Sequence, residues 1–404
     1  MDIVNIDPFT RCRPGERKRL EMNNFTYYNP TTILFGKGTI ARINTLLPID
    51  SKVMLLAGGG SIKSNGVYAQ VKNALTGYRL TEFWGIQPNP EYETCMQAVE
   101  KARHEKVEFL LAVGGGSVLD AAKFIAAATL YDGDDPWDLM GDRASVKPAL
   151  PIGSILTLPA TGSESNGNAV ISRRESNQKL ALSSTTLWPR FAVLDPETTY
   201  SLPERQTING IVDAFVHVTE QYLTFDIDTP LQDRQAEAIL NTLVEEAPKV
   251  KADPENYDAR ANIMWAATNA LNTLIGCGVV QDWATHMIGH EITVITGLDH
   301  ARTLAVIHPS LLRFLRKQKQ DKLAQFGRRV WSLAGSDEEI AEKAIDKMEE
   351  FFRETGIGTR FSDYGIDAST CLVAAERLTE RMGPVGEKGN LDKEAIETIL
   401  ENAQ

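Results

Sequence analysis

The sequence predicts an α/β N-terminal domain, built on a parallel sheet with flanking helices, and an all-α C-terminal domain. Short β-rich runs alternate with helical stretches from Thr32 to about Leu194, which is the rhythm of βαβ units. After "LDPETTYSLPERQ" the strand-like runs largely end, and segments rich in Ala, Leu and Glu follow from about Ile208. A length of 404 residues also suggests about two domains.

Four apolar runs mark the expected strands: "KVMLLA", "FLLAVGGG", "IGSILTLPA" and "FAVLD". We place the domain boundary near Tyr200, with residues 22–199 in the α/β domain and residues 200–404 in the helical, metal-binding domain. Residues 1–21 are charged, contain Pro and Gly and precede the patterned sequence, so we expect a disordered extension there.

The composition points to small-molecule chemistry. The chain has 42 Lys and Arg against 54 Asp and Glu, a net charge of −12, which speaks against nucleic acid as a partner. Its four cysteines are far apart and form no CxxC motif, so a reducing cytoplasm fits best. Because no apolar run approaches the length of a membrane span, no membrane partner is expected.

A glycine triplet, Gly114, Gly115 and Gly116, follows the expected strand Phe109–Val113 and precedes a helix that begins near Ser117. Glycines let a phosphate approach the backbone, and the start of the following helix attracts its charge. Ser117 and Asp120 also have the Ser-x-x-Asp spacing of a capping box, which is their alternative, structural interpretation.

A second triplet, Gly58, Gly59 and Gly60, follows another apolar run and precedes Ser61 and Lys63. Neither triplet has the G-x-G-x-x-G spacing of the common dinucleotide fingerprint. Two such turns at strand ends in one domain nevertheless favour dinucleotide binding.

A third turn, "LTLPATGSESN", places Thr157 and Thr161 behind another expected strand. Hydroxyl-rich turns can hold a ribose or pyrophosphate through hydrogen bonds. Taken alone, such a turn is more often an ordinary polar loop.

The stretch "NGIVDAFVHVTEQY" has the pattern of an amphipathic helix and places Asp213 four residues before His217. Side chains with this spacing project from one helix face and can converge on one point. Two interpretations follow: an Asp–His pair on a solvated edge, or half of a metal site.

Three further histidines, His286, His290 and His300, lie close together in the sequence. One Asp with three imidazoles would complete a four-coordinate site for Fe²⁺ or Zn²⁺, and spacing alone leaves open whether His286, His290 or both ligate. His104 and His308 lie outside this cluster, and we interpret them as surface or packing residues. The H-E-x-x-H motif is absent, and a metal hydrolase would leave the glycine turns unexplained.

Four segments, "GGGSVLDAAK", "LPATGSES", "NGIVDAFVHVTEQY" and "DWATHMIGHE…GLDHA", occur in this order. Together they resemble the iron-containing (group III) alcohol dehydrogenase family, and most of all its butanol-dehydrogenase-like, NADPH-dependent aldehyde reductase branch. The resemblance runs from Met22 to near the end of the chain. It implies a dehydroquinate-synthase-like architecture with an N-terminal dinucleotide-binding domain, an all-helical C-terminal domain and a catalytic site in the cleft between them.

The resemblance also implies roles for single residues. The implied metal ligands are Asp213, His217, His286 and His300, while His290 would stay unligated as a catalytic proton relay. The implied cofactor contacts are Gly114, Gly115, Gly116, Ser117 and Asp120 at the pyrophosphate and ribose, and Thr157, Thr161 and Lys179 on the nicotinamide side.

Gly59 matches a position where NAD-dependent relatives carry an acid that binds the adenosine ribose. Without that charge there is room for a 2′-phosphate beside Ser61 and Lys63, which favours NADP(H). The implied activity is the reversible, metal-dependent reduction of small aldehydes to primary alcohols by a homodimer.

Two other functions remain open from the sequence. A dehydroquinate-synthase-like or glycerol-dehydrogenase-like enzyme would share the architecture, but it would need a basic pocket or a different ligand set. A nucleotide-binding protein without catalysis would keep these motifs only as scaffold. Trp283 and Met287 suggest an apolar pocket wall but are equally typical of helix packing.

Overall fold

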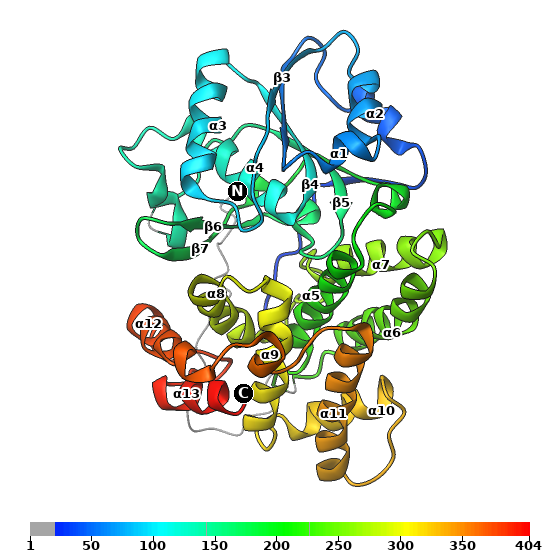
Figure 1. The fold of residues 1–404 in the computed structure, drawn as a ribbon, viewed down its shortest axis with the longest axis vertical. Coiled ribbons are helices and arrows are strands. Elements are labelled where there is room, and N and C mark those ends of the chain that lie inside the picture. The colour runs from blue at the N-terminus through cyan, green and yellow to red at the C-terminus, as the bar shows by residue number, and fades with distance from the viewer. Residues whose placement is uncertain (1–20, 143, 226) are drawn as a thin grey trace. The chain divides into compact units, whose positions relative to one another are not determined.

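The structure is a computed structural model that describes residues 21–404 except residues 143 and 226 (Figure 1). Apart from Glu21, the expected disordered extension lies outside the described residues. By its internal contacts the chain divides into an α/β unit, residues 28–207 and 252–272, and a helical unit, which takes the remaining described residues. The domain boundary near Tyr200 stays a prediction.

The α/β unit contains a six-stranded sheet in the order β1-β8-β5-β4-β2-β3, and every neighbouring pair is parallel. Its strands are β1 (Thr32–Phe35), β2 (Lys52–Ala57), β3 (Arg79–Phe83), β4 (Phe109–Gly115), β5 (Ile152–Leu158) and β8 (Phe191–Leu194). Its helices are α1 (Ser61–Ser64), α2 (Val67–Ala74), α3 (Tyr92–Glu105), α4 (Gly116–Leu130) and α7 (Tyr257–Ala270). Short 3₁₀ helices are η1 (Thr39–Thr45), η2 (Pro136–Asp142), η3 (Ser163–Ser165), η4 (Thr185–Leu187) and η5 (Pro196–Thr199).

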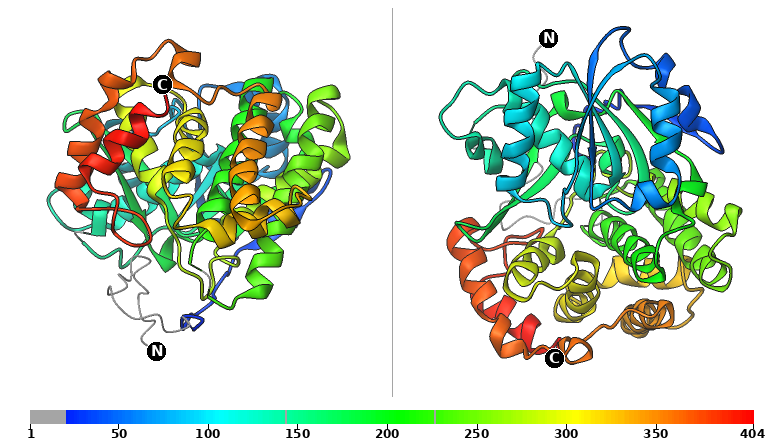
Figure 2. Two further views of the ribbon diagram at one scale, coloured as in Figure 1. Left: turned by 90° about the horizontal axis from the view of Figure 1, so that it is seen from below. Right: turned by 45° about the horizontal axis from the view of Figure 1, so that its top comes forward.

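The central strands are apolar on both faces, as a sheet covered by helices on both sides requires. On β2, Met54 and Leu56 pack with α3 and α4, while Val53 and Leu55 face the side covered by α2 and η1. Helices of the unit accordingly flank the sheet on either side (Figures 1 and 2). The predicted parallel sheet with flanking helices is confirmed.

Two features of this unit were not predicted. An antiparallel hairpin, β6 (Asn168–Arg173) and β7 (Gln178–Ser183), follows the third polar turn. Helix α7, which comes later in the sequence, packs against η3 and η5, and its Met264 lies in a buried cluster with Leu156 and Leu194.

The rest of the described chain is helical, as predicted. Its helices are α5 (Glu204–Tyr222), α6 (Pro230–Ala252), α8 (Ala284–Thr296), α9 (His300–Phe314), α10 (Gln320–Arg329), α11 (Asp337–Thr355), α12 (Val373–Met382) and α13 (Lys393–Glu401), with 3₁₀ helices η6 (Phe361–Tyr364) and η7 (Ala368–Cys371). An aromatic cluster of Phe215, Phe326, Phe351 and Phe352 joins α5, α10 and α11. No helix among the described residues has the length and apolarity that crossing a membrane requires.

Candidate functional site

The glycine turns lie at one edge of the sheet. Because β2, β4 and β5 are parallel and stand in the order β5-β4-β2, their carboxyl ends lie side by side. The chain continues from β2 to β3 on one side and then crosses to β4 on the other, so the strand order reverses between β2 and β4. Ligands of open α/β sheets bind at such a switch point. Gly58–Gly60 follow β2, while Gly114 and Gly115 end β4 and Gly116 begins α4.

The triplet at the junction of β4 and α4 is also required by packing. A Cβ on Gly114 would lie 2.6 Å from Val118 Cγ2, and one on Gly116 would lie 2.4 Å from Thr161 Oγ1. On Gly115 it would lie 3.0 Å from Leu158 Cβ. Glycine therefore lets the first turn of α4 approach the end of β5 and brings Gly116 beside Thr161 of the third polar turn.

Asp120 does not cap α4, so the capping-box interpretation is wrong. The helix begins after Gly115 without a side-chain cap. Asp120 instead accepts hydrogen bonds from Ser163 Oγ at 2.7 Å and from the Val170 N–H at 3.0 Å. Burial raises the pKa of this carboxyl group, and Lys123 opposes that shift. Each oxygen keeps a lone pair, so a cofactor hydroxyl can still be accepted.

Lys123 on α4 is a further site residue that no sequence motif indicated. Its fully buried ammonium donates to Ser163 Oγ, Asn166 Oδ1 and the Asn168 carbonyl oxygen at 2.6–2.9 Å. Burial lowers the pKa of Lys123 to about 8. These three bonds organise the turn that carries Thr161. A lysine surrounded by Ala, Phe and Ile in an otherwise apolar helix was the available signal.

The remaining predicted cofactor residues surround the same edge of the sheet. Thr157 is buried on β5, and Lys179 on β7 donates to Asn89 Oδ1 at 2.9 Å. Gly60 has φ +107° directly before α1, which contains Ser61 and Lys63. The Lys63 ammonium lies 3.8 Å from the centre of the Trp84 ring.

The helix that carries Asp213 and His217 is buried on every side from Ile208 to Tyr222, so it is not amphipathic as its pattern suggested. Asp213 is 3% exposed and His217 is 4% exposed. These low exposures exclude the interpretation of Asp213 and His217 as an Asp–His pair on a solvated edge of the helix. A buried carboxylate with adjacent imidazoles needs polar partners or an ion to offset its lost hydration.

Helices α8 and α9 supply the other histidines. Gly289 permits close packing of these helices, since a Cβ there would lie 3.0 Å from Thr303 Oγ1. His300 is the first residue of α9. The residue before it, Asp299, accepts a hydrogen bond from Asn209 Nδ2 at 2.9 Å, which ties the start of α9 to α5.

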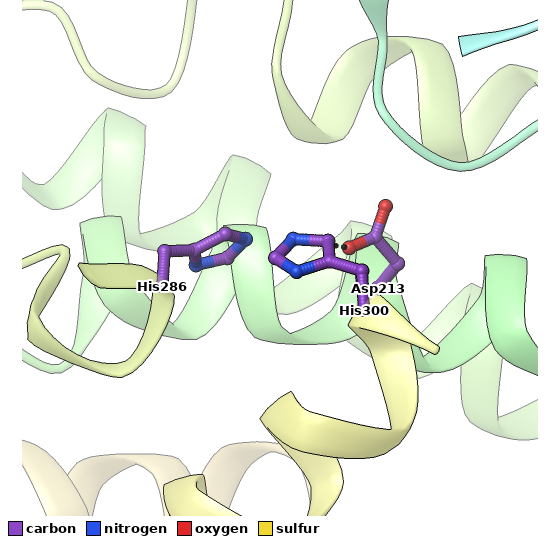
Figure 3. A group of neighbouring side chains, drawn as sticks. All are labelled: Asp213, His286 and His300. Atoms are coloured by element: carbon purple, nitrogen blue, oxygen red, sulfur yellow. Dashed lines mark ion pairs between the residues drawn. The ribbon is translucent and has the colours of Figure 1, made fainter. Parts of the chain in front are cut away.

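Asp213, His286 and His300 converge in the helical unit (Figure 3). Each offers one ligand atom, and these atoms lie within 4.8 Å of one another. His300 Nε2 is 3.7 Å from Asp213 Oδ1. Metal–ligand bonds of about 2.0–2.2 Å place two ligand atoms of one ion at most about 4.4 Å apart, and the distance between His300 and Asp213 lies within that limit. The donor set of one carboxylate with imidazoles suits Fe²⁺ or Zn²⁺.

His217 and His290 lie beside this trio. His217 Nδ1 is 3.9 Å from Asp213 Oδ2, and the His217 ring stacks on that of His286 with their centres 4.6 Å apart. The His290 ring centre is 5.0 Å from that of His300 and 6.4 Å from that of His286. The group of converging ligand atoms contains neither His217 nor His290, although both rings adjoin it.

A layer of buried polar groups surrounds the ligand candidates. Glu220 on α5 contacts Nδ1 of His286, and burial raises the pKa of Glu220 well above its ordinary value. His308 on α9 bonds Thr219 Oγ1 and Thr285 Oγ1, both at 2.9 Å, which links α9 to α5 and α8. The sequence analysis did not single out Glu220, although it lies three residues after His217 in the same helix.

The model of the iron-containing alcohol dehydrogenase family matches residues 30–196, and the model of the family's C-terminal part, described as "Fe-containing alcohol dehydrogenase family, C-terminal", matches residues 207–404. The NADPH-dependent aldehyde reductase YqhD of Escherichia coli is 52% identical over 95% of this chain and 100% of its own length. Its crystal structure superimposes with a TM-score of 0.92.

Two further relatives differ in their cofactor. The NADP-dependent alcohol dehydrogenase 3 of Entamoeba histolytica is 41% identical over 86% of this chain and 90% of its own length. The structure of the NADH-dependent butanol dehydrogenase A of Thermotoga maritima is 35% identical, with a TM-score of 0.91 over 95% of this chain and 99% of that one. The protein therefore belongs to the iron-containing alcohol dehydrogenase family.

Proposed function

We propose that this protein is an NADPH-dependent, metal-dependent aldehyde reductase that converts small aldehydes to primary alcohols and also works in reverse. The observation that carries the proposal is the convergence of Asp213, His286 and His300 in a chain 52% identical to an NADPH-dependent aldehyde reductase. In this proposal His217 is the fourth ligand, and the metal is Fe²⁺ or Zn²⁺, since both accept this donor set.

When bound, the metal supplies a Lewis acid for the carbonyl oxygen, and NADPH supplies the hydride. His290 then holds the proton that the product oxygen needs, because an imidazole exchanges protons near neutral pH. Trp283 supplies an apolar wall: its ring centre lies 5.3 Å from that of His286, and its backbone is held at φ +62°. Met287, in the first turn of α8, belongs to the same wall.

The cofactor proposal places the pyrophosphate at Gly114–Ser117, with Asp120 on a ribose hydroxyl. The nicotinamide lies toward Thr157, Thr161 and Lys179. The reversal of strand order between β2 and β4 supports this position. The adenosine end reaches Gly58–Gly60, where Ser61 and Lys63 hold the 2′-phosphate of NADP.

We further propose a cytoplasmic homodimer. Strand β1 is an edge of the sheet, and an exposed edge favours pairing with another chain. Phe35, the last residue of β1, and Trp265 on α7 are 40% and 47% exposed although their rings contact each other. Sedimentation equilibrium tests the dimer.

The test of the function is NADPH oxidation with butanal, measured on chelator-stripped protein and again after Fe²⁺ or Zn²⁺ is added back. NADH is measured in parallel. We expect metal-restored turnover that favours NADPH. In His300→Ala we expect turnover to fall by about 100-fold or more, since the Lewis acid contributes several kcal/mol; His104→Ala, on the exposed side of α3, serves as the control.

Equal turnover of butanal with and without the metal would disprove the proposed chemistry. If NADPH binds but no aldehyde is reduced with any metal, the protein is a nucleotide-binding protein or acts on another substrate class. Unchanged turnover in His300→Ala would remove the metal site from the mechanism.

A further inference from the structure

Glu220 is a buried carboxylate for which the proposed reaction has no direct use. It lies on α5, three residues after His217 and seven after Asp213, and it is 3% exposed. Residues at these spacings share one face of a helix. The side chain is thus directed to the same side of α5 as the two ligand candidates, one turn or more further along.

Both oxygens of Glu220 contact the first turn of α8. One oxygen contacts Nδ1 of His286, and the other accepts the backbone N–H of Thr285 at 2.6 Å. The N–H groups in the first turn of a helix have no partner within that helix. Glu220 therefore fixes the backbone that carries His286 together with the ring itself.

The contact with Nδ1 bears on which nitrogen of His286 can bind a metal. A neutral imidazole carries one N–H and one lone pair, so an Nδ1–H that donates to Glu220 leaves the lone pair on Nε2. Figure 3 shows one ring nitrogen of His286 directed toward His300 and Asp213.

We propose that Glu220 is a positioning residue of the metal centre, which holds His286 through Nδ1 so that Nε2 is presented to the metal. This inference rests on the proposed function, because it takes His286 to be a ligand. A carboxylate behind a histidine ligand also increases the basicity of that ligand, and loss of such a partner typically weakens metal binding about 10–100-fold.

Further buried groups hold the same turn. Asp282 accepts the Ala284 N–H at 3.1 Å, and its own N–H donates to the Glu220 carbonyl oxygen at 3.0 Å. The Lys319 ammonium bonds Asp282 at 2.7 Å and Glu387 at 3.0 Å and offsets the buried negative charge. The segment that Glu220 contacts is therefore held by several buried hydrogen bonds and ion pairs.

The experiment compares metal affinity in the full-length wild type, Glu220→Gln and Glu220→Leu. Chelator-stripped protein is titrated with Zn²⁺ in competition with a chromophoric chelator, and the visible spectrum is recorded with Co²⁺. The Gln carbonyl oxygen can serve only one of the two N–H donors. We expect Zn²⁺ to bind about 10-fold more weakly in Glu220→Gln and about 100-fold more weakly in Glu220→Leu, with a changed Co²⁺ spectrum.

Glu349→Gln is the matched control. Glu349 is also buried, and it bonds Thr359 and Arg313 but none of the ligand candidates. We expect this variant to lose stability without losing Zn²⁺ affinity. Equal Zn²⁺ affinity and an unchanged Co²⁺ spectrum in both Glu220 variants would overturn the proposal, even if their melting temperatures fall.

Zn²⁺ binding and aldehyde reduction by the wild type distinguish failure of the positioning role from failure of the proposed function. If it binds Zn²⁺ more tightly than Glu220→Gln but reduces no aldehyde, the function fails and the positioning role holds. If it binds no metal, both fail.

Discussion

Gly59 lies in the turn after β2, and a Cβ built there would meet no atom within 4 Å. Gly59→Asp should therefore fold normally. Its carboxylate would repel a 2′-phosphate and could accept a bond from a 2′-hydroxyl, so we expect KM for NADPH to rise at least about 10-fold while KM for NADH falls. Steady-state kinetics with butanal measure both. Gly59→Ala should keep the NADPH preference; the same preference in Gly59→Asp would show that the 2′-phosphate binds elsewhere.

In the proposed site His290 relays a proton and does not bind the metal, and its ring lies beside that of His300. We expect His290→Gln to keep its metal and to lose about 100-fold or more in kcat, which is the usual contribution of a positioned proton donor. Elemental analysis and kcat measured together decide this. A variant that loses the metal would make His290 a ligand, and unchanged kcat would assign the proton to water.

At the scale of elements, His308 joins the three helices that carry the ligand candidates. Burial, with His286 and Lys319 nearby, lowers the pKa of His308 from 6.5 to about 3. The folded state thus keeps this imidazole neutral, while the unfolded chain takes up a proton below pH 6.5. Stability should therefore fall as the pH falls, by about 2 kcal/mol at pH 5 from this group.

Urea unfolding between pH 5 and pH 8 tests this effect by comparing the wild type with His308→Gln. Gln keeps hydrogen-bonding groups between Thr219 and Thr285 but does not titrate. We expect a shallower pH dependence in the variant, and parallel profiles would show that His308 is not the group responsible. The histidines of the metal site are common to both proteins and cancel in the comparison.

The elements that follow from local sequence patterns, such as apolar runs and helical spacing, could be predicted from the sequence. Strands such as β4 are continuous apolar runs because helices cover both faces of the sheet, so they were found from the sequence. Asp213 and His217 were found because helical spacing brings them together. The packing of α7 in the α/β unit, the bonds of Lys123 and the contact between Glu220 and His286 depend on residues far away in the sequence. No periodicity encodes such contacts.

At the scale of the whole molecule, the residues proposed to bind the metal and those proposed to bind the cofactor belong to different units. The metal ligand candidates all lie in the helical unit, while the glycine turns and their neighbours lie in the α/β unit. A ligand stabilises the folded segment to which it binds, by about 2.7 kcal/mol at a concentration 100 times its Kd. Metal and cofactor should therefore protect different backbone segments.

Amide hydrogen exchange resolves these segments. With Zn²⁺ alone, we expect slower exchange in α5, in the first turns of α8 and at the start of α9, with no change after β2 and β4. With NADP⁺ alone, the turns at Gly58–Gly60 and Gly114–Ser117 should slow instead. His300→Ala should lose the first effect and keep the second, because only the metal site is altered. If Zn²⁺ protected the glycine turns in the absence of cofactor, the assignment of one ligand to each unit would be wrong.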